Sequence, residues 1–372
     1  MSIRPTRRGF LATTGLVAGA AVLGGRATAA AARTTSLSRT QVIADTRRAA
    51  DYWLTRTPQY NNDNNWQNAT FHSGNMALFK LTQDAKYRDF SKAWAEFHNY
   101  QLMADSSTAP FHADHEAAGQ VYLDLYALDP QPQFIDATVS RISAQIASGR
   151  TDYWWWVDAL HMAMPVFARL GVLKNSTQHL DYLYSSYTYT KSQTSKRTGL
   201  WNPNQRLWWR DNNYVRSSTY WSRGNGWSIA AHAKVLAALP STAAHYSEYA
   251  DNLKSMAAAL KPLQRADGFW NASLTDPVNY AGPETSGTAF FTYGLAYGIN
   301  RGLLDAATYL PVVERAWQGL VSIALRSDGL LGYVQGPGAK PSDNYPWSAT
   351  STYSYGVGAF LLAGTEVAAL AV

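Results

Sequence analysis

Residues 157–164 read Val-Asp-Ala-Leu-His-Met-Ala-Met, an apolar run that contains a single carboxyl group. Five other stretches share its apolar, Gly- and Ala-rich character: 73–78, 117–122, 227–231, 285–291 and 356–362. A helix that is apolar on nearly all sides is buried, and its small residues let neighbouring backbones approach closely. We therefore expect these six stretches to belong to an inner ring of helices.

The spacing between helices favours a ring of hairpins. Six further stretches, such as 88–101 and 247–262, carry charge on one face and suit a solvated outer ring. Connections after an inner stretch have two to four residues, whereas those before one have ten or more, except at 149–154. Short connections join antiparallel helices, so the long loops gather at one end. The sequence predicts an all-α fold, an (α/α)6 barrel of six helical hairpins. The predicted helix starts are Gln41, Gly74, Tyr87, His115, Gln131, Trp155, Ser176, Gly224, Ala243, Glu284, Tyr309 and Tyr353.

The first 29 residues resemble an export signal. Thr6-Arg7-Arg8-Gly9-Phe10-Leu11 is typical of the twin-arginine pathway, an apolar stretch follows to Leu23, and small residues surround Ala27-Thr28-Ala29. The apolar stretch is too short for a stable membrane span, and it disfavours a nucleic-acid-binding arm. We expect cleavage near residue 29 and a secreted protein with no membrane span.

The charge and cysteine content exclude several classes. The four Arg residues of the signal account for most of the formal charge of +6, and about +2 remains without them. A nucleic-acid partner thereby loses its main support. The chain has no Cys, hence no disulfide, thiolate metal site or thiol nucleophile. No break in composition divides residues 34–372, which we expect to form one catalytic domain.

Tryptophan gathers in the long loops and in the first turns of the inner helices they lead into. Aromatic faces around a cleft suit sugar rings, whose C–H groups form apolar faces edged with hydroxyls. The alternative, core filling beneath the loops, suits any single Trp, but it does not favour one rim. The residues concerned are Trp66, Trp154, Trp155, Trp156, Trp201, Trp208, Trp209, Trp221, Trp227, Trp270 and Trp347.

Two carboxyl groups are candidates for acid–base work. Asp158 follows Trp154-Trp155-Trp156-Val157, and desolvation there would raise its pKa and keep it protonated, as a general acid requires. The alternative is a buried Asp satisfied by hydrogen-bond donors. Asp114 lies at the predicted start of another inner helix, where it would cap the helix and face Asp158 across the rim. A metal held by His112, Asp114 and His115 fits no regular spacing, so we expect neither a metal nor a cofactor.

Two arginines could bind an anion at the same rim. Arg210 lies in Leu207-Trp208-Trp209-Arg210-Asp211, and Arg223 lies just before an inner helix. An Arg beside a helix N-terminus is a favourable place for a carboxylate. The alternative for Arg210 is an ion pair with Asp211 or another loop acid.

Several ordered motifs resemble a known family. They are Trp-Trp-Trp-Val-Asp-Ala-Leu-His-Met-Ala at 154–163, Trp-Ser-Arg-Gly-Asn-Gly-Trp at 221–227, Glu-Thr-Ser-Gly-Thr-Ala at 284–289, and further matches at 264–270 and 355–363. Together they resemble glycoside hydrolase family 105, the unsaturated rhamnogalacturonyl hydrolases, and the related family 88, the unsaturated glucuronyl hydrolases. The resemblance runs from about Trp66 to Glu366.

The resemblance implies a metal-free (α/α)6 hydrolase that removes 4,5-unsaturated uronic acids from lyase-generated oligosaccharides of the pectin or rhamnogalacturonan type. The family's catalytic carboxyls correspond to Asp158 and Asp114. Its substrate-binding Trp, Arg and Trp correspond to Trp221, Arg223 and Trp227. Relatives carry a His where this chain has Arg210-Asp211, which bears on substrate preference.

We also expect Arg210, His115 and Trp155 to contact the substrate. In the implied mechanism, Asp158 protonates C4 of the C4=C5 double bond and then draws a proton from the water that attacks C5. The hemiketal opens and expels the remaining sugar, so carboxyl separation does not predict retention or inversion. The alternatives are another (α/α)6 carbohydrate enzyme, either a polysaccharide lyase or an inverting glycosidase, and a non-catalytic sugar-binding protein.

Overall fold

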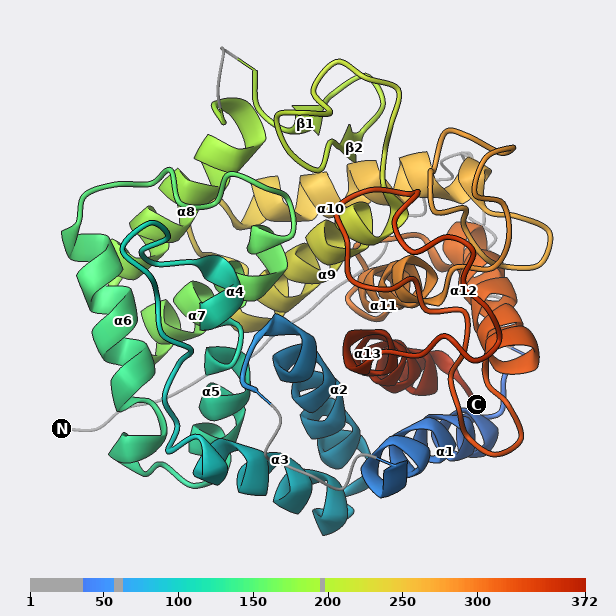
Figure 1. Cartoon of the computed structure of the whole chain (residues 1–372), viewed down its shortest axis with the longest axis horizontal. Helices are drawn as coiled ribbons and strands as arrows, with labels where there is room; N and C mark the ends of the chain where they lie inside the picture. Colours follow the sequence, from blue (N-terminus) through green and yellow to red (C-terminus); the bar gives the residue numbers. More distant parts are fainter. Residues whose placement is uncertain (1–35, 57–62, 195–197) are drawn as a thin grey trace, which may run out of the picture. The chain divides into compact units, whose positions relative to one another are not determined.

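Every predicted inner stretch lies in, or directly at the start of, a buried helix of the computed structural model, which describes residues 36–56, 63–194 and 198–372. The predicted export signal lies outside the described residues. Around the inner ring, each helix packs on the next, and the last closes on the first (Figure 1). The inner helices are α2 (Trp66–Thr82), the one-turn α4 (Ala113–Glu116) with α5 (Gly119–Leu128), α7 (Ala159–Leu173), α9 (Ser222–Ala238), α11 (Thr285–Asn300) and α13 (Ser354–Leu370).

A second set of helices covers the inner ring from outside. Each hairpin partner that the sequence predicted is present and packs against inner helices or against its outer neighbours, so the predicted (α/α)6 barrel is confirmed. The outer helices are α1 (Arg39–Arg56), α3 (Ala85–Phe97), α6 (Asp136–Ala147), α8 (Thr177–Ser192), α10 (Tyr246–Leu260) and α12 (Ala306–Gly319). Short 3-10 turns are η1 (Pro132–Phe134) and η2 (Lys261–Leu263), and η3 (Leu320–Ala324) is a π-helical turn.

Glycines let the inner helices touch at their backbones. A Cβ atom on Gly74 of α2 would collide with the carbonyl oxygen of Gly358 of α13, and one on Gly358 would collide with the carbonyl oxygen of Thr70. Gly287 of α11 likewise faces Ser222 of α9 without room for a side chain. Larger side chains would push these helices apart, so the small residues fix the diameter of the ring.

Several helix boundaries differ from the predictions, most of them by one to three residues. Helix α2 begins at Trp66 rather than Gly74, because the side chain of Asn65 accepts a hydrogen bond from the backbone N of Trp66, at 2.8 Å. The single helix predicted from His115 to Leu128 is broken into α4 and α5. Helix α7 begins at Ala159 instead of Trp155.

The long loops are joined to the starts of the inner helices by backbone hydrogen bonds. Val157 N donates to Arg210 O at 2.8 Å, Ser222 N to Ala272 O at 2.8 Å, and Thr285 N to Tyr333 O at 2.9 Å. Within the loop before α9, β1 (Trp201–Asn202) and β2 (Leu207–Trp208) pair antiparallel. These contacts hold the loops over one end of the ring, where the candidate site lies.

Residues 33–372 form one compact unit. Within the described residues, none of the helices has the length and hydropathy needed to cross a bilayer.

Candidate active site

Asp158 lies at the N-terminal boundary of α7 and has not been used as a helix cap. It occupies the N-cap position in a helical conformation, and its side chain makes no capping hydrogen bond. The residue is 8% exposed, and Oδ2 has no hydrogen-bond partner among the described residues. Burial raises the pKa of Asp158, although the guanidinium groups of Arg210 and Arg223 oppose that rise. A buried carboxyl group with an unused oxygen is suited to hold a proton and give it away.

Asp114 lies in the first turn of α4, where its charge acts on Asp158. Burial, and then the charge of Asp158, raise the pKa of Asp114 to about 7, while Arg210 lowers it. The two carboxyl groups therefore interact, and ionisation of one disfavours ionisation of the other. The predicted convergence of Asp114 and Asp158 agrees with this electrostatic coupling.

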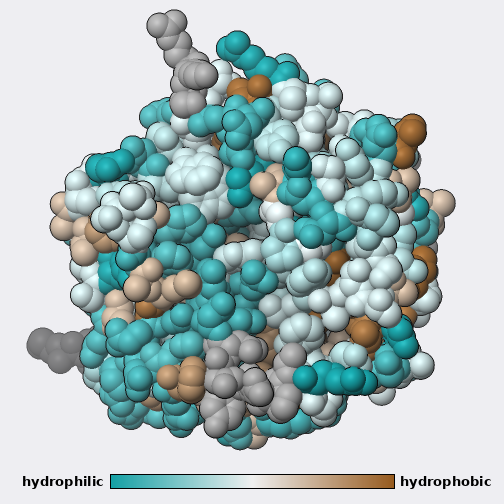
Figure 2. Space-filling view, viewed as in Figure 1, coloured by the Kyte–Doolittle hydropathy of each residue, from teal (hydrophilic) through white to brown (hydrophobic). Residues whose placement is uncertain are grey.

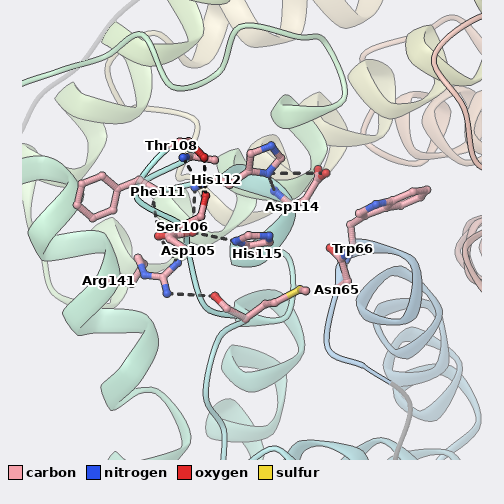
Figure 3. Close-up of polar contacts among 12 residues, drawn as sticks. Asn65, Trp66, Asp105, Ser106, Thr108, Phe111, His112, Asp114, His115 and Arg141 are labelled. Carbon is pink, nitrogen blue, oxygen red and sulfur yellow. Dashed lines mark hydrogen bonds and ion pairs between the residues drawn. The ribbon is translucent and has the colours of Figure 1, made fainter.

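The prediction that Asp114 caps its helix was wrong. His112 is the N-cap residue of α4, and its Nδ1 accepts a hydrogen bond from Asp114 N at 3.3 Å. Burial and the neighbouring His115 lower the pKa of His112, so its imidazole is neutral at pH 7. The Asp114 carboxylate, 3.8 Å from His112 Nδ1, keeps its oxygens free of the helix end (Figure 3).

Arg210 connects the loop before α9 to the carboxyl pair. Its Nη1 donates to Asp211 Oδ2 at 2.7 Å, and its Nε lies 3.4 Å from Asp158 Oδ2. Arg210 thus forms the ion pair with Asp211 that was the predicted alternative, and it forms a second ion pair with Asp158. Asp211 also accepts a hydrogen bond from Asn213 N at 2.8 Å, which fixes the turn that carries Arg210. Part of the Arg210 side chain remains exposed, so it can still meet an anionic ligand.

His115 is held by the loop before α4. Its Nδ1 lies 2.9 Å from Asp105 Oδ1, and Arg141 of α6 binds the other oxygen of Asp105 at 2.8 Å. Figure 3 shows the His115 ring joined to Asp105, with the Asp114 carboxyl group on the other side of it, beside His112. His115 thus braces the loop, and its partial exposure leaves its predicted substrate contact as a prediction.

Most of the loop tryptophans are core residues. Only Trp155, at 44%, is exposed among the eleven residues singled out from the sequence; Trp66 and Trp201 are half-buried. The expectation of a tryptophan-lined rim was therefore wrong as a general statement, because the loops fold back onto the helix ends and need apolar filling. The buried members are Trp154, Trp156, Trp208, Trp209, Trp221, Trp227, Trp270 and Trp347.

Trp155 stays next to the candidate acid. Its ring lies 5.9 Å from the Arg210 guanidinium carbon and 4.6 Å from the ring of Trp156, which in turn lies 4.7 Å from His112. An aromatic and cationic wall therefore runs from Arg210 to the start of α4. On the face seen in Figure 2, hydrophilic residues cover the area around α4.

Arg223 is buried and already bonded. It is 1% exposed, and its Nη1 and Nη2 donate to the carbonyl oxygens of Gln335 and Gly336 at 2.7 and 2.9 Å. Its guanidinium carbon lies 4.5 Å from the ring of Trp221 and 5.0 Å from that of Tyr355. In this structure Arg223 braces the loop 325–353 against α9, rather than facing an open surface.

Gln335 joins three of the sequence motifs, one of them through its carbonyl oxygen, which accepts a hydrogen bond from the Tyr355 hydroxyl. Trp221 Nε1 donates to Gln335 Oε1 at 2.9 Å, and Gln335 N donates to Glu284 Oε1 at 3.2 Å. Glu284 also caps α11 by accepting hydrogen bonds from the backbone N of Ser286 and Gly287. No signal in the sequence marked Gln335, since it lies more than a hundred residues from Trp221.

Trp227 packs inside the ring. It is almost fully buried, with its ring 4.3 Å from Phe290 and 4.8 Å from His161. The predicted substrate contacts of Trp221 and Trp227 remain predictions, and both rings are packed against protein here. Sequence reasoning also missed the orienting positions of His112 and Asp211. The His-x-Asp spacing and the Arg-Asp pair were the available signals.

Acid–base chemistry needs no metal in this arrangement. Within residues 36–56, 63–194 and 198–372, no group of three or more His, Cys, Asp or Glu side chains has the geometry of a metal site. Two coupled carboxyl groups can supply and withdraw a proton, and the adjacent Arg210 can stabilise an anion. Such a pair at one end of a helical barrel is suited to acid–base catalysis.

The comparisons with known proteins specify the family. The sequence profile of glycosyl hydrolase family 88 matches residues 43–371, so the chain belongs to that family. An unsaturated 3S-rhamnoglycuronyl hydrolase of Formosa agariphila is 34% identical over an alignment of 329 residues, and the match covers 81% of this chain and 84% of that protein.

Two solved structures are similar over most of their length. One, described as a glycosyl hydrolase family 88 protein from Bacteroides vulgatus, is 33% identical with a TM-score of 0.84 and covers 90% of this chain and 100% of its own. The other, described as a polysaccharide lyase, is 35% identical with a TM-score of 0.82 and covers 89% and 97%. The predicted resemblance to glycoside hydrolase family 105 and the related family 88 is thereby confirmed.

Proposed function

We propose that this protein removes a 4,5-unsaturated uronic acid from the non-reducing end of lyase-generated oligosaccharides. The observation that carries the proposal is the coupled pair Asp114 and Asp158, beside the partly exposed Arg210, in a chain of family 88. The name of the Formosa agariphila relative, an unsaturated rhamnoglycuronyl hydrolase, supports the same reaction.

The proposed chemistry begins with proton transfer. Burial favours the protonated form of Asp158, which delivers its proton to C4 of the C4=C5 bond. Positive charge then develops at C5 and the ring oxygen, and the carboxylate of Asp158 accepts a proton from the water that adds to C5. The hemiketal formed in this way opens, and the C1–O bond to the neighbouring sugar breaks as the product rearranges to its open form.

Arg210 is the residue best placed to receive the uronate. It lies beside Asp158 and is partly exposed, whereas the guanidinium of Arg223 is occupied by two carbonyl oxygens. The substrate carboxylate would bind the same Arg210 guanidinium that Asp158 and Asp211 contact. This placement also puts C5, which bears the carboxylate, and its neighbour C4 next to Asp158.

The neighbouring sugar in the proposed substrate is rhamnose. The relative's name contains a rhamnoglycuronyl group, and its prefix 3S points to a substituent on that group. Unsaturated uronyl-rhamnose disaccharides with and without a sulfate at O3 of rhamnose test this directly. A preference of less than about twofold between rhamnose and glucosamine substrates would contradict the assignment of the sugar, but not the reaction.

A polysaccharide lyase is the second candidate, because one solved structure described in that way is 35% identical. Ultraviolet absorbance separates the two reactions. A hydrolase destroys the conjugated double bond of a lyase-digested oligosaccharide, so the absorbance falls, whereas a lyase creates that bond in an intact uronate polymer. A rise in absorbance with the intact polymer would overturn the proposed hydrolysis.

We also propose export through the twin-arginine pathway. The support is the Arg7-Arg8 pair before the apolar run that ends near Leu23. Replacing both arginines by lysine should leave the protein in the cytoplasm of a twin-arginine-competent host and should preserve its activity there. Equal secretion of both forms would overturn the proposal.

A further inference from the structure

A polar cavity lies at the opposite end of the ring from the carboxyl pair. Its volume is about 270 Å³, and every inner-ring position contributes to its wall: α2, α5, α7, α9, α11 and α13. Arg169 of α7 lines it eleven residues after Asp158, which corresponds to about 16 Å along the helix. The cavity is therefore a feature separate from the proposed active site.

Positive charge dominates the wall of this cavity. Lys80, Arg169 and Lys234 line it together with one carboxylate, Asp124. Asp124 Oδ1 is shared by Lys80 Nζ at 2.7 Å and Arg169 Nη1 at 2.9 Å. The formal charge of these four groups is about +2 when Lys234 is protonated, and Asp124 is already committed to the other two cations.

Lys234 is held by neutral acceptors. Its Nζ donates to Ser73 Oγ and to Gln120 Oε1, both at 2.8 Å, and within the described residues no carboxylate lies within 4 Å of it. An ammonium group has three N–H donors, so a third remains for the cavity. Burial lowers the pKa of Lys234 to about 7. The charge of Asp124 opposes this shift, and the charges of Arg169 and Lys80 lower the pKa further.

The orientation of Gln120 is set by a proline. Pro165 lies inside α7 and has no N–H, which leaves the carbonyl oxygen of His161 without its helical donor. Gln120 Nε2 donates to that oxygen at 2.7 Å, so its Oε1 must face the cavity and Lys234. The position of the ammonium group is thus built into α5 and α7 rather than left to a flexible side chain.

We propose that this cavity, around Lys234, binds a small tetrahedral oxyanion such as sulfate or phosphate. Such an ion fits a space that is smaller than the usual site for a drug-sized ligand. It offers acceptors for the third Lys234 donor and for the Arg169 guanidinium. Access is through the side where Lys80 lies, since 51% of that side chain is exposed.

Thermal unfolding in sodium sulfate or sodium phosphate, compared with sodium chloride at equal ionic strength, tests this site. We compare how much the oxyanion raises the Tm of each protein. At about ten times its Kd, this rise should be about 2 °C larger for the wild type than for Lys234→Met. General salt stabilisation raises both proteins alike, so only this difference counts. Equal gains for wild type and Lys234→Met would overturn the proposal.

Control variants keep the test specific. Lys254→Met removes an exposed lysine of α10 that pairs with Asp251, and it should respond as the wild type does. Arg210→Gln should also respond fully, because its guanidinium belongs to the other end of the ring. Loss of the response in Arg210→Gln would move the anion to the proposed active site and overturn the cavity assignment.

Two further measurements apply even if Lys234→Met does not fold. Lys80→Met removes the cation at the exposed mouth together with its ion pair to Asp124, and it should weaken sulfate binding several-fold in calorimetry. In the wild type at pH 8, sulfate binding should take up a proton, because the anion favours the charged form of Lys234. Binding with no proton uptake, or unaltered affinity in Lys80→Met, would contradict the proposal.

Discussion

The Nε atom of Arg210 lies 3.4 Å from Oδ2 of Asp158, and neither atom has a hydrogen-bond partner among the described residues. The guanidinium therefore acts on the carboxyl group through charge without taking up its lone pairs. Arg210 lowers the pKa of both Asp158 and Asp114 against the larger effect of burial. One residue thus adjusts the acidity of the pair and, in the proposed function, also binds the substrate anion.

Replacing Asp158 by Asn should remove the proton donor and leave the fold intact. We expect turnover of an unsaturated uronide to fall on the order of a thousandfold or more, with Tm within a few degrees of the wild type. The matched control is Asp152→Asn in the same loop, where the carboxylate pairs with Arg150 at the surface. Turnover of Asp158→Asn within about tenfold of the wild type would remove Asp158 from the mechanism.

Arg210→Gln should change the pH profile as well as the rate. Removing the guanidinium raises the pKa of both carboxyl groups, and a general acid stays protonated to higher pH when its pKa rises. The basic limb of kcat/KM should therefore move to higher pH, while Arg210→Lys should keep most of the original profile. The maximum of kcat/KM should fall about thirty- to a thousandfold, because the uronate loses its partner.

That penalty for Arg210→Gln should shrink on a methyl ester of the same substrate, which has no carboxylate to bind. An equal penalty on both substrates would show that Arg210 supports the site without touching the uronate.

Asp114→Asn should alter the pH dependence of stability. The pKa of Asp114 is about 7 in the folded protein and near 3.8 in the unfolded chain, so between these values the folded state binds more protons. The contribution of Asp114 to the free energy of unfolding is then present at low pH and is lost as pH rises towards 7. The variant lacks this dependence, so its Tm relative to the wild type should increase from pH 5 to pH 8.

Asp136→Asn is the control for this measurement, because Asp136 lies in the first turn of α6 and is exposed. We also expect a large loss of activity in Asp114→Asn. The helix itself should be little affected, because His112 supplies the cap.

The ring of helices was predictable because its signals are local. Small apolar residues such as Gly74 and Gly358 report directly on backbone contact, and short connections report on antiparallel pairing. The loops over the rim were harder, since their partners are distant in the chain. Nothing near Arg223 showed that the carbonyl oxygens of Gln335 and Gly336 would occupy it, and a buried Trp in a loop has the same local sequence as an exposed one.

Arg223→Met should therefore be mainly a structural lesion. It leaves the buried carbonyl oxygen of Gly336 without its donor and that of Gln335 with the Tyr355 hydroxyl alone, which costs on the order of 3 kcal/mol, so Tm should fall clearly. Activity should fall by the same factor on the carboxylate and on its methyl ester. A penalty confined to the charged substrate, with Tm unchanged, would instead assign the uronate to Arg223.

Asn225 links the start of α9 to the loop that carries Arg210, and this link gives the last test. Its Oδ1 accepts a hydrogen bond from Trp208 N at 2.8 Å, and its Nδ2 donates to Trp208 O and to Trp221 O, both at 3.0 Å. Asn225→Ala leaves these backbone groups of β2 buried and unpaired, so β2 should detach from α9 and Arg210 should lose its fixed distance to Asp158. We expect kcat to fall at least about tenfold, and the basic limb of the pH profile should move towards that of Arg210→Gln.

The matched control is Asn202→Ala, at the more exposed end of the same hairpin. The Asn202 side chain donates to the Tyr220 hydroxyl at 2.6 Å, and this variant should keep the wild-type profile. If Asn225→Ala lowers Tm but leaves the pH profile unchanged, the loop is held by other contacts, and Asn225 has no part in setting the acidity of Asp158.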